Sequence, residues 1–178
     1  EADNHRDMRK AIQGALRGTP AGSRDPDARD PVLKSIAAVG LRNYAQRAPE
    51  HGNSAVAFGE AMSATATAMV TWIFFGAEPG TEVHQRLLSH FQELGPYGLV
   101  WNPQECQEIA LRSFIDDLRA EVEALRAGKG TLSRSGMLAV LAEDEMPDES
   151  MLGNLIYQAE MGRSDMKNFF RSEERRVG

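Results

Sequence analysis

The chain has 178 residues, of which 42% are apolar and 26% charged, and it carries a net charge of −6 with an isoelectric point near 5.3. This composition is typical of a globular protein and excludes a disordered chain, and the length suits one domain with a sizeable core. The acidic balance argues against a general binder of nucleic acid or anionic membranes. The single cysteine, Cys106, excludes an internal disulfide and favours a reducing compartment, so we expect a cytoplasmic protein.

Neither a signal peptide nor a membrane-spanning segment is predicted. The first ten residues contain no apolar core. The most apolar run, residues 64–75, is shorter than the roughly 20 residues that cross a bilayer. The chain begins on Glu1 rather than Met, which leads us to expect a piece of a longer protein.

Apolar residues recur at helical spacing along almost the whole chain, and strand-like alternation never lasts more than a few residues. Asp30, Asn102 and Asp148 stand at predicted helix starts, the first two directly before a proline. The chain is therefore predicted to be all-α, with the longest helix at 102–127. The predicted helices span residues 4–17, 31–48, 54–75, 82–94, 102–127, 135–141 and 148–170.

The last predicted helix, residues 148–170, carries features that a simple packing helix does not need. Glu160 interrupts its apolar face, and Gly162 removes a side chain in mid-helix at a cost of about 1 kcal/mol relative to alanine. Ser164 and Asp165 follow directly. Bare backbone beside a hydroxyl and an acid indicates that another group approaches this helix closely.

This helix resembles the long central helix of the cytochrome P-450 monooxygenases, which reads roughly G-N-L-I, a short apolar run, then A-G-x-acid-T. Residues 153–156 match the first part, and Gly162 takes the place of the glycine. Ser164 stands where the family has an acid, and Asp165 where it has threonine, so the acid and the hydroxyl occur in swapped order.

Two further motifs carry the same resemblance. His5 and Arg9 form H-x-x-x-R, which resembles the heme-propionate motif of soluble bacterial members, and residues 69–76, MVTWIFFG, resemble the family's apolar helix end before a glycine. Side chains at i and i+4 share a helix face, so two charge-assisted donors can reach one pair of carboxylates. A surface His and Arg is the alternative. The resemblance extends from about residue 3 to 171.

The resemblance implies a heme-thiolate monooxygenase, which inserts one oxygen atom into a small organic substrate with electrons from a ferredoxin- or flavoprotein-type donor. It implies heme as cofactor, bound by His5, Arg9 and Gly162, with Ser164 and Asp165 as catalytic residues that supply protons. The swap leaves room for a peroxide-using member, and a solvent-facing Ser-Asp pair is the alternative. Aromatic and apolar residues of a lid at 87–109 would line the substrate entrance: Phe91, Tyr97, Leu99 and Trp101.

The iron ligand of this family is absent from the chain. That ligand is a cysteine in a glycine-rich loop, whereas Cys106 lies in a predicted helix without neighbouring glycine, and the family's E-x-x-R pair is missing too. We therefore expect a partial cytochrome P-450 domain at 1–171 that is inactive by itself and has no metal ligand. Residues 172–178 are expected to be a non-native tail, because RSEERRVG resembles translated sequencing adapter.

Two other classes remain open on the sequence alone. One is a non-enzymatic all-α ligand-binding or regulatory module, and the other is a structural helical domain with His5 and Arg9 on its surface. No basic patch or helix-turn-helix is found, so no nucleic-acid partner is expected.

Overall fold

The computed structural model describes residues 2–22, 30–49, 54–95, 104–143 and 146–177, with side chains described except at 2–5, 54–55 and 171–177. Within these ranges all regular structure is helical, as predicted. The elements are α1 (Ala2–Gly18), the 3-10 turn η1 (Pro20–Gly22), α2 (Pro31–Arg47), α3 (Ser54–Phe75), α4 (Glu82–Leu94), α5 (Glu105–Arg126), α6 (Met137–Leu141) and α7 (Glu149–Val177). None of the described helices is long and apolar enough to cross a membrane.

The helix starts agree with the capping signals in the sequence wherever the structure describes them. The Asp30 carboxylate accepts a hydrogen bond from the Val32 backbone N–H at 2.8 Å, and Asp148 accepts one from Met151 at 2.7 Å. Helix α5 begins after Gln104, whose side chain and backbone form a capping box with Gln107. Asn102, the predicted cap of this helix, lies outside the described residues.

Helix α7 is longer than the sequence suggested. It spans 29 residues against 22 for α5, so the prediction that the segment at 102–127 forms the longest helix is wrong. The predicted end at Phe170 is also passed, and the helix continues to Val177. The reason is local, because residues 171–177 contain neither Gly nor Pro and are rich in Glu and Arg, which favour helix.

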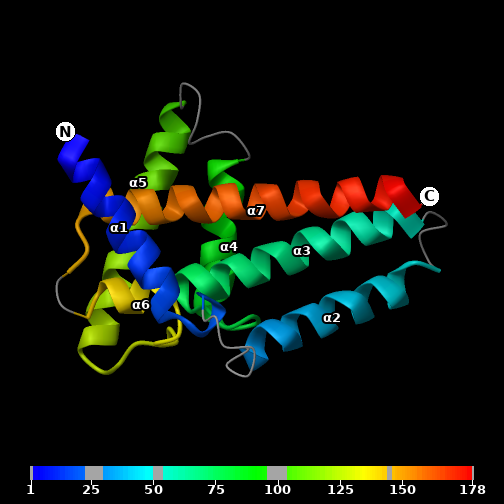
Figure 1. The fold of residues 1–178 in the computed structure, drawn as a ribbon, viewed down its shortest axis with the longest axis horizontal. Coiled ribbons are helices and arrows are strands. Elements are labelled where there is room, and N and C mark those ends of the chain that lie inside the picture. Colours follow the sequence, from blue (N-terminus) through cyan, green and yellow to red (C-terminus); the bar gives the residue numbers. More distant parts are fainter. Residues whose placement is uncertain (1, 23–29, 50–53, 96–103, 144–145, 178) are drawn as a thin grey trace.

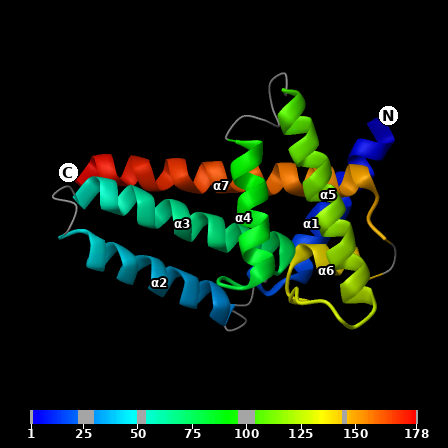
Figure 2. The same cartoon turned by 180° about the vertical axis from the view of Figure 1, so that it is seen from behind.

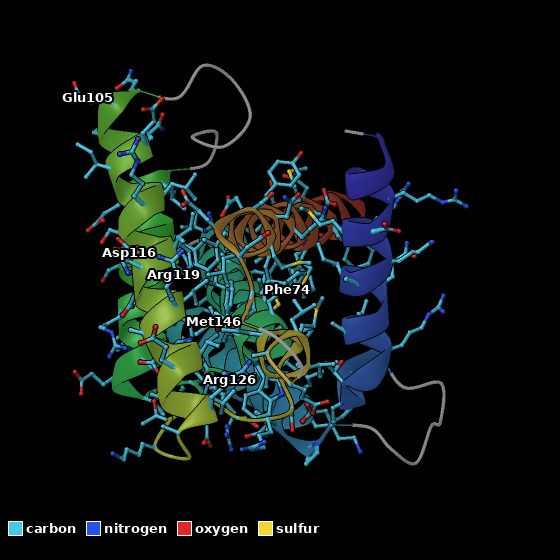
Figure 3. All side chains as sticks on the ribbon, turned by 90° about the vertical axis from the view of Figure 1, so that its left-hand side faces the viewer. Phe74, Glu105, Asp116, Arg119, Arg126 and Met146 are labelled. Atoms are coloured by element: carbon cyan, nitrogen blue, oxygen red, sulfur yellow. The ribbon has the colours of Figure 1, made fainter. Side chains whose placement is uncertain are left out.

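Three long helices form one layer, in which α3 lies between α7 and α2 (Figures 1 and 2). Seen along this layer, α4 and α5 lie on one side and α1 on the opposite side (Figure 3). Helix α1 packs against α6, and α4 packs against α5. Helix α7 therefore lies along α3 and also packs against α5.

The core is centred on an aromatic cluster from three helices. Phe75 at the end of α3 lies 6.2 Å from Phe91 of α4 and 5.8 Å from Phe114 of α5, measured between ring centroids. Leu155 and Ile156 of α7 are fully buried in the same cluster. The apolar stripes read from the sequence thus converge on one core.

Two glycines allow the segment that leads into α6 to lie close to the end of α3. Gly76 ends α3 with a φ of +73°, and its carbonyl accepts a hydrogen bond from Ser133 at 2.8 Å. A Cβ on Gly136 would lie 2.3 Å from the Gly76 nitrogen. Both positions therefore require glycine, and they hold α6 against the end of α3.

Candidate functional site

Glu160, the acid that interrupts the apolar face of α7, forms a buried ion pair with Arg163. Both Glu160 oxygens accept hydrogen bonds from Arg163, at 2.8 Å from Nε and 2.7 Å from Nη2. Glu160 is buried, and Arg163 is largely so. This planar, two-bond geometry satisfies the carboxylate inside the protein. The sequence analysis missed this pairing, although the i, i+3 spacing of an acid and an arginine was visible.

Arg163 also connects α7 with α4. Its guanidinium carbon lies 5.5 Å from the centre of the Phe91 ring, within the range of a cation–π contact. Phe91 is buried in the aromatic cluster. The resemblance implies that Phe91 lines a substrate entrance. In the structure its ring packs against Phe75 and Phe114 and also forms part of the wall of the groove described below, and the substrate contact stays a prediction. Tyr97, Leu99 and Trp101 lie outside the described residues.

Gly162 faces α3. A Cβ at this position would lie 3.9 Å from side-chain atoms of Phe74 and Val70, which is ordinary van der Waals contact. An alanine would therefore fit, and packing against α3 does not require a glycine here. The part in heme binding that the resemblance implies for Gly162 stays a prediction.

Ser164 and Asp165 differ in their surroundings. Ser164 is half-buried and Asp165 is exposed. Adjacent helical residues point about 100° apart, which accounts for this difference. Neither side chain has a hydrogen bond among the described residues, so their part in proton transfer stays a prediction too.

Arg9 is exposed on α1, and the His5 side chain lies outside the described residues. Among the described side chains Arg9 has no ion-pair partner, so it is available to an anionic group. Helix α1 packs mainly on α6 and lies near the start of α7 (Figures 1 and 2). Gly162 is 13 residues into α7, about 20 Å along the helix. The structure does not bring Arg9 together with Gly162, Ser164 or Asp165.

Cys106 is exposed in the first turn of α5, and its Sγ lies 3.9 Å from Gln104 Oε1. Figure 3 shows the neighbouring Glu105 on the opposite side of the molecule from α1. Cys106 and Arg9 therefore cannot serve one heme. Among the described residues no group of three or more His, Cys, Asp or Glu side chains could hold a metal ion. Arg9 is an exposed donor of the kind that a heme carboxylate requires, and the heme expected from the resemblance stays a prediction.

A groove of about 980 Å³ lies beside the buried ion pair, between α2, α3, α4 and α7. His84 of α4 is part of its wall and is 6% exposed. Neither ring nitrogen of His84 has a hydrogen-bond partner among the described residues. Burial lowers the pKa of His84, which favours the neutral imidazole. The sequence analysis missed this residue, although His84, Leu87 and Phe91 share the i, i+3, i+7 stripe of α4.

Helix α4 is held to α5 by a charge network. Arg86 of α4 donates hydrogen bonds to Glu121 and, at 3.3 Å, to Asp117 of α5. His90 lies 3.3 Å from the same Asp117 carboxylate and stacks on Phe114 at 4.8 Å. These contacts make α4 and α5 one packed pair over the core.

Comparison of the chain with protein-family models, curated proteins and solved structures gave no match. Over the described residues, the fold and the site define an all-α protein with a buried ion pair on its longest helix and a groove beside that pair.

Proposed function

We propose that this chain is part of a heme-thiolate monooxygenase of the cytochrome P-450 type, a cytoplasmic enzyme that inserts one oxygen atom into a small organic substrate. The observation that carries the proposal is the order of three motifs in the sequence. H-x-x-x-R lies on α1, the apolar run closing at Gly76 ends α3, and G-N-L-I opens α7. A ferredoxin- or flavoprotein-type donor would supply the electrons.

In this proposal each residue has a defined task. Arg9 and His5 donate charge-assisted hydrogen bonds to the heme carboxylates. Ser164 and Asp165 hold a water molecule and pass a proton through it. Gly162 contributes to heme binding by leaving no side chain on α7 at that point. The heme, when bound, supplies the oxidation chemistry, and its iron ligand comes from residues outside this chain.

The chain by itself is proposed to be inactive. We expect that hemin added to the purified chain forms no thiolate complex, because Cys106 lies on the far side of the molecule from Arg9. Absorption spectroscopy of the wild-type chain and of Cys106→Ser measures this directly. A tight complex that Cys106→Ser abolishes would contradict the proposal.

Membership of the cytochrome P-450 family is tested on the longer protein of which this chain is proposed to be a part. Sequencing the source DNA beyond the codon for Phe170 should reveal an open frame that reaches E-x-x-R and a glycine-rich cysteine loop. In that longer protein, Arg9→Leu should lower the heme content, whereas Arg6→Leu, an exposed arginine on the same helix, should not. A genuine stop after Gly178 would contradict the proposal and leave the ligand-binding or regulatory module.

A further inference from the structure

The groove between α2, α3, α4 and α7 has the dimensions of a small-molecule site. Its volume of about 980 Å³ lies at the upper end of the roughly 300–1,000 Å³ common for ligand pockets. Much of its wall is apolar, including Ile36, Val39, Ala68, Leu88 and Phe91. Among the described residues, none from α1 lines the groove, and Gly162, Ser164 and Asp165 are not part of the wall. The groove therefore reaches α7 at Arg163 and Lys167, and not at the residues proposed to face heme.

One group in this wall has an unmet hydrogen-bonding need. A neutral imidazole has one donor and one acceptor, and burying either without a partner costs about 1–3 kcal/mol. His84 lines the groove, but both of its ring nitrogens are buried, each with less than 1 Å² exposed and without a partner among the described residues. A bound molecule with a hydroxyl or carbonyl group would supply that partner once the ring turns toward the groove.

The charges around the groove favour an uncharged ligand. In the lining, Arg163 is paired with Glu160 and Glu60 with Arg47, which leaves the opposite charges of Glu78 and Lys167. An ionic ligand would therefore meet no excess of opposite charge, and it would lose hydration on entering an apolar wall.

We propose that this groove binds an uncharged, largely apolar organic molecule that carries a hydroxyl or carbonyl group, and that His84 is the residue that recognises the polar group. The apolar wall of α2 and α3 holds the body of the molecule. Phe91, beneath Arg163, closes the wall on the side of α4 and α7.

The test uses the purified 178-residue chain with 1-naphthol and, for comparison, naphthalene. Fluorescence titration should show saturable one-to-one binding of 1-naphthol. His84→Phe keeps an aromatic ring in the wall, and it should weaken 1-naphthol binding about five- to tenfold, as expected for one lost hydrogen bond, with naphthalene binding unchanged. The matched control is His90→Phe on the same helix, since His90 does not line the groove.

Two further measurements keep the test independent of the folding of His84→Phe. Ala64→Trp places a bulky side chain at an exposed position of the lining and should abolish binding of both compounds. The nitrogen chemical shifts of the His84 ring should change on adding 1-naphthol and not on adding naphthalene. The proposal is overturned if 1-naphthol does not saturate, if Ala64→Trp leaves binding intact, or if His90→Phe weakens it as much as His84→Phe. None of these outcomes bears on the heme proposal, which rests on α1 and α7.

Discussion

Two polar side chains with the same low exposure of 6%, Asp30 and His84, have opposite hydrogen-bonding states. Asp30 uses both oxygens, one for the Val32 N–H at the start of α2 and one for the Trp72 indole N–H of α3, at 2.6 Å. His84 has no partner for either ring nitrogen among the described residues. Asp30 therefore stabilises the fold. Burying His84 without a partner is costly, and we propose that a bound ligand supplies that partner.

Replacing Asp30 should strongly destabilise the protein. Asp30→Ala removes the cap of α2 and leaves the buried Trp72 N–H without an acceptor, which should cost about 2–4 kcal/mol of unfolding free energy. Asp30→Asn, with one carbonyl oxygen, should lie between wild type and alanine. Urea unfolding measures the difference, and Asp116→Ala, at an exposed carboxylate, is the control. Equal losses at the two positions would show that the Asp30 bonds contribute nothing.

His84 should make the stability fall in mild acid. Burial lowers the pKa of His84 in the folded protein, so below about pH 6.5 the unfolded chain takes up a proton that the folded chain does not. Above that pH the free energy of unfolding does not change through His84. Below it the free energy of unfolding falls as the pH falls, with a slope of at most about 1.4 kcal/mol per pH unit. Urea midpoints at about pH 7.5 and about pH 5.5 should differ less in His84→Phe than in wild type. Identical pH dependence in the two proteins would contradict this assignment.

At the scale of elements, α2 and α3 approach each other through a glycine. A Cβ on Gly40 would lie 2.0 Å from Thr65 Oγ1, and that hydroxyl donates to the Ala61 carbonyl at 2.7 Å. The contact sets how closely α2 can lie along α3. It also sets the width of the groove, because Gly40 and Thr65 both line it.

Gly40→Ala should therefore destabilise the protein by about 1–3 kcal/mol, since the added methyl group forces the two helices apart. Gly14→Ala is the matched control in α1, where nothing lies within 4 Å, and it should stabilise the protein by up to about 1 kcal/mol. Thermal unfolding compares the two. Adding Thr65→Ala to Gly40→Ala should recover part of the loss, and no recovery would place the cause elsewhere.

At the scale of the whole molecule, one aromatic cluster joins the layer of long helices to the α4–α5 pair. Phe75 of α3 is fully buried, and its ring contacts Phe91 of α4 and Phe114 of α5, so three helices meet at this residue. The charge network of Arg86 lies outside this cluster and adds contacts between α4 and α5 alone.

Phe75→Ala should cost about 3–5 kcal/mol and lower the unfolding midpoint seen by every probe, because the cavity opens where three helices meet. Leu41→Ala, at a position 59% exposed on α2, should stay within about 0.5 kcal/mol of wild type. Circular dichroism and tryptophan fluorescence should report one shared transition. Separate transitions would show that the α4–α5 pair unfolds independently of the layer.

The sequence by itself determined the helices and most of their beginnings, because caps such as Asp30 and Asp148 act on backbone groups two or three residues away. It could not determine the far end of α7. There the apolar stripe ends at Phe170, but the local preference for helix continues in the residues that follow. Apolar periodicity reports which face is buried, and a helix can extend beyond the part that packs.

Only the tertiary structure decided which polar groups are buried together. The Glu160–Arg163 pair is local in sequence, but its contact with Phe91 of α4 is set by the tertiary structure. His84 reads from the sequence as one histidine in an apolar stripe, and the groove beside it needs residues from four helices. The candidates Arg9, Gly162, Ser164 and Asp165 came from a resemblance, and the structure places Arg9 apart from the other three. Their membership of one site stays a prediction, whereas the groove at His84 is formed by the tertiary packing of four helices.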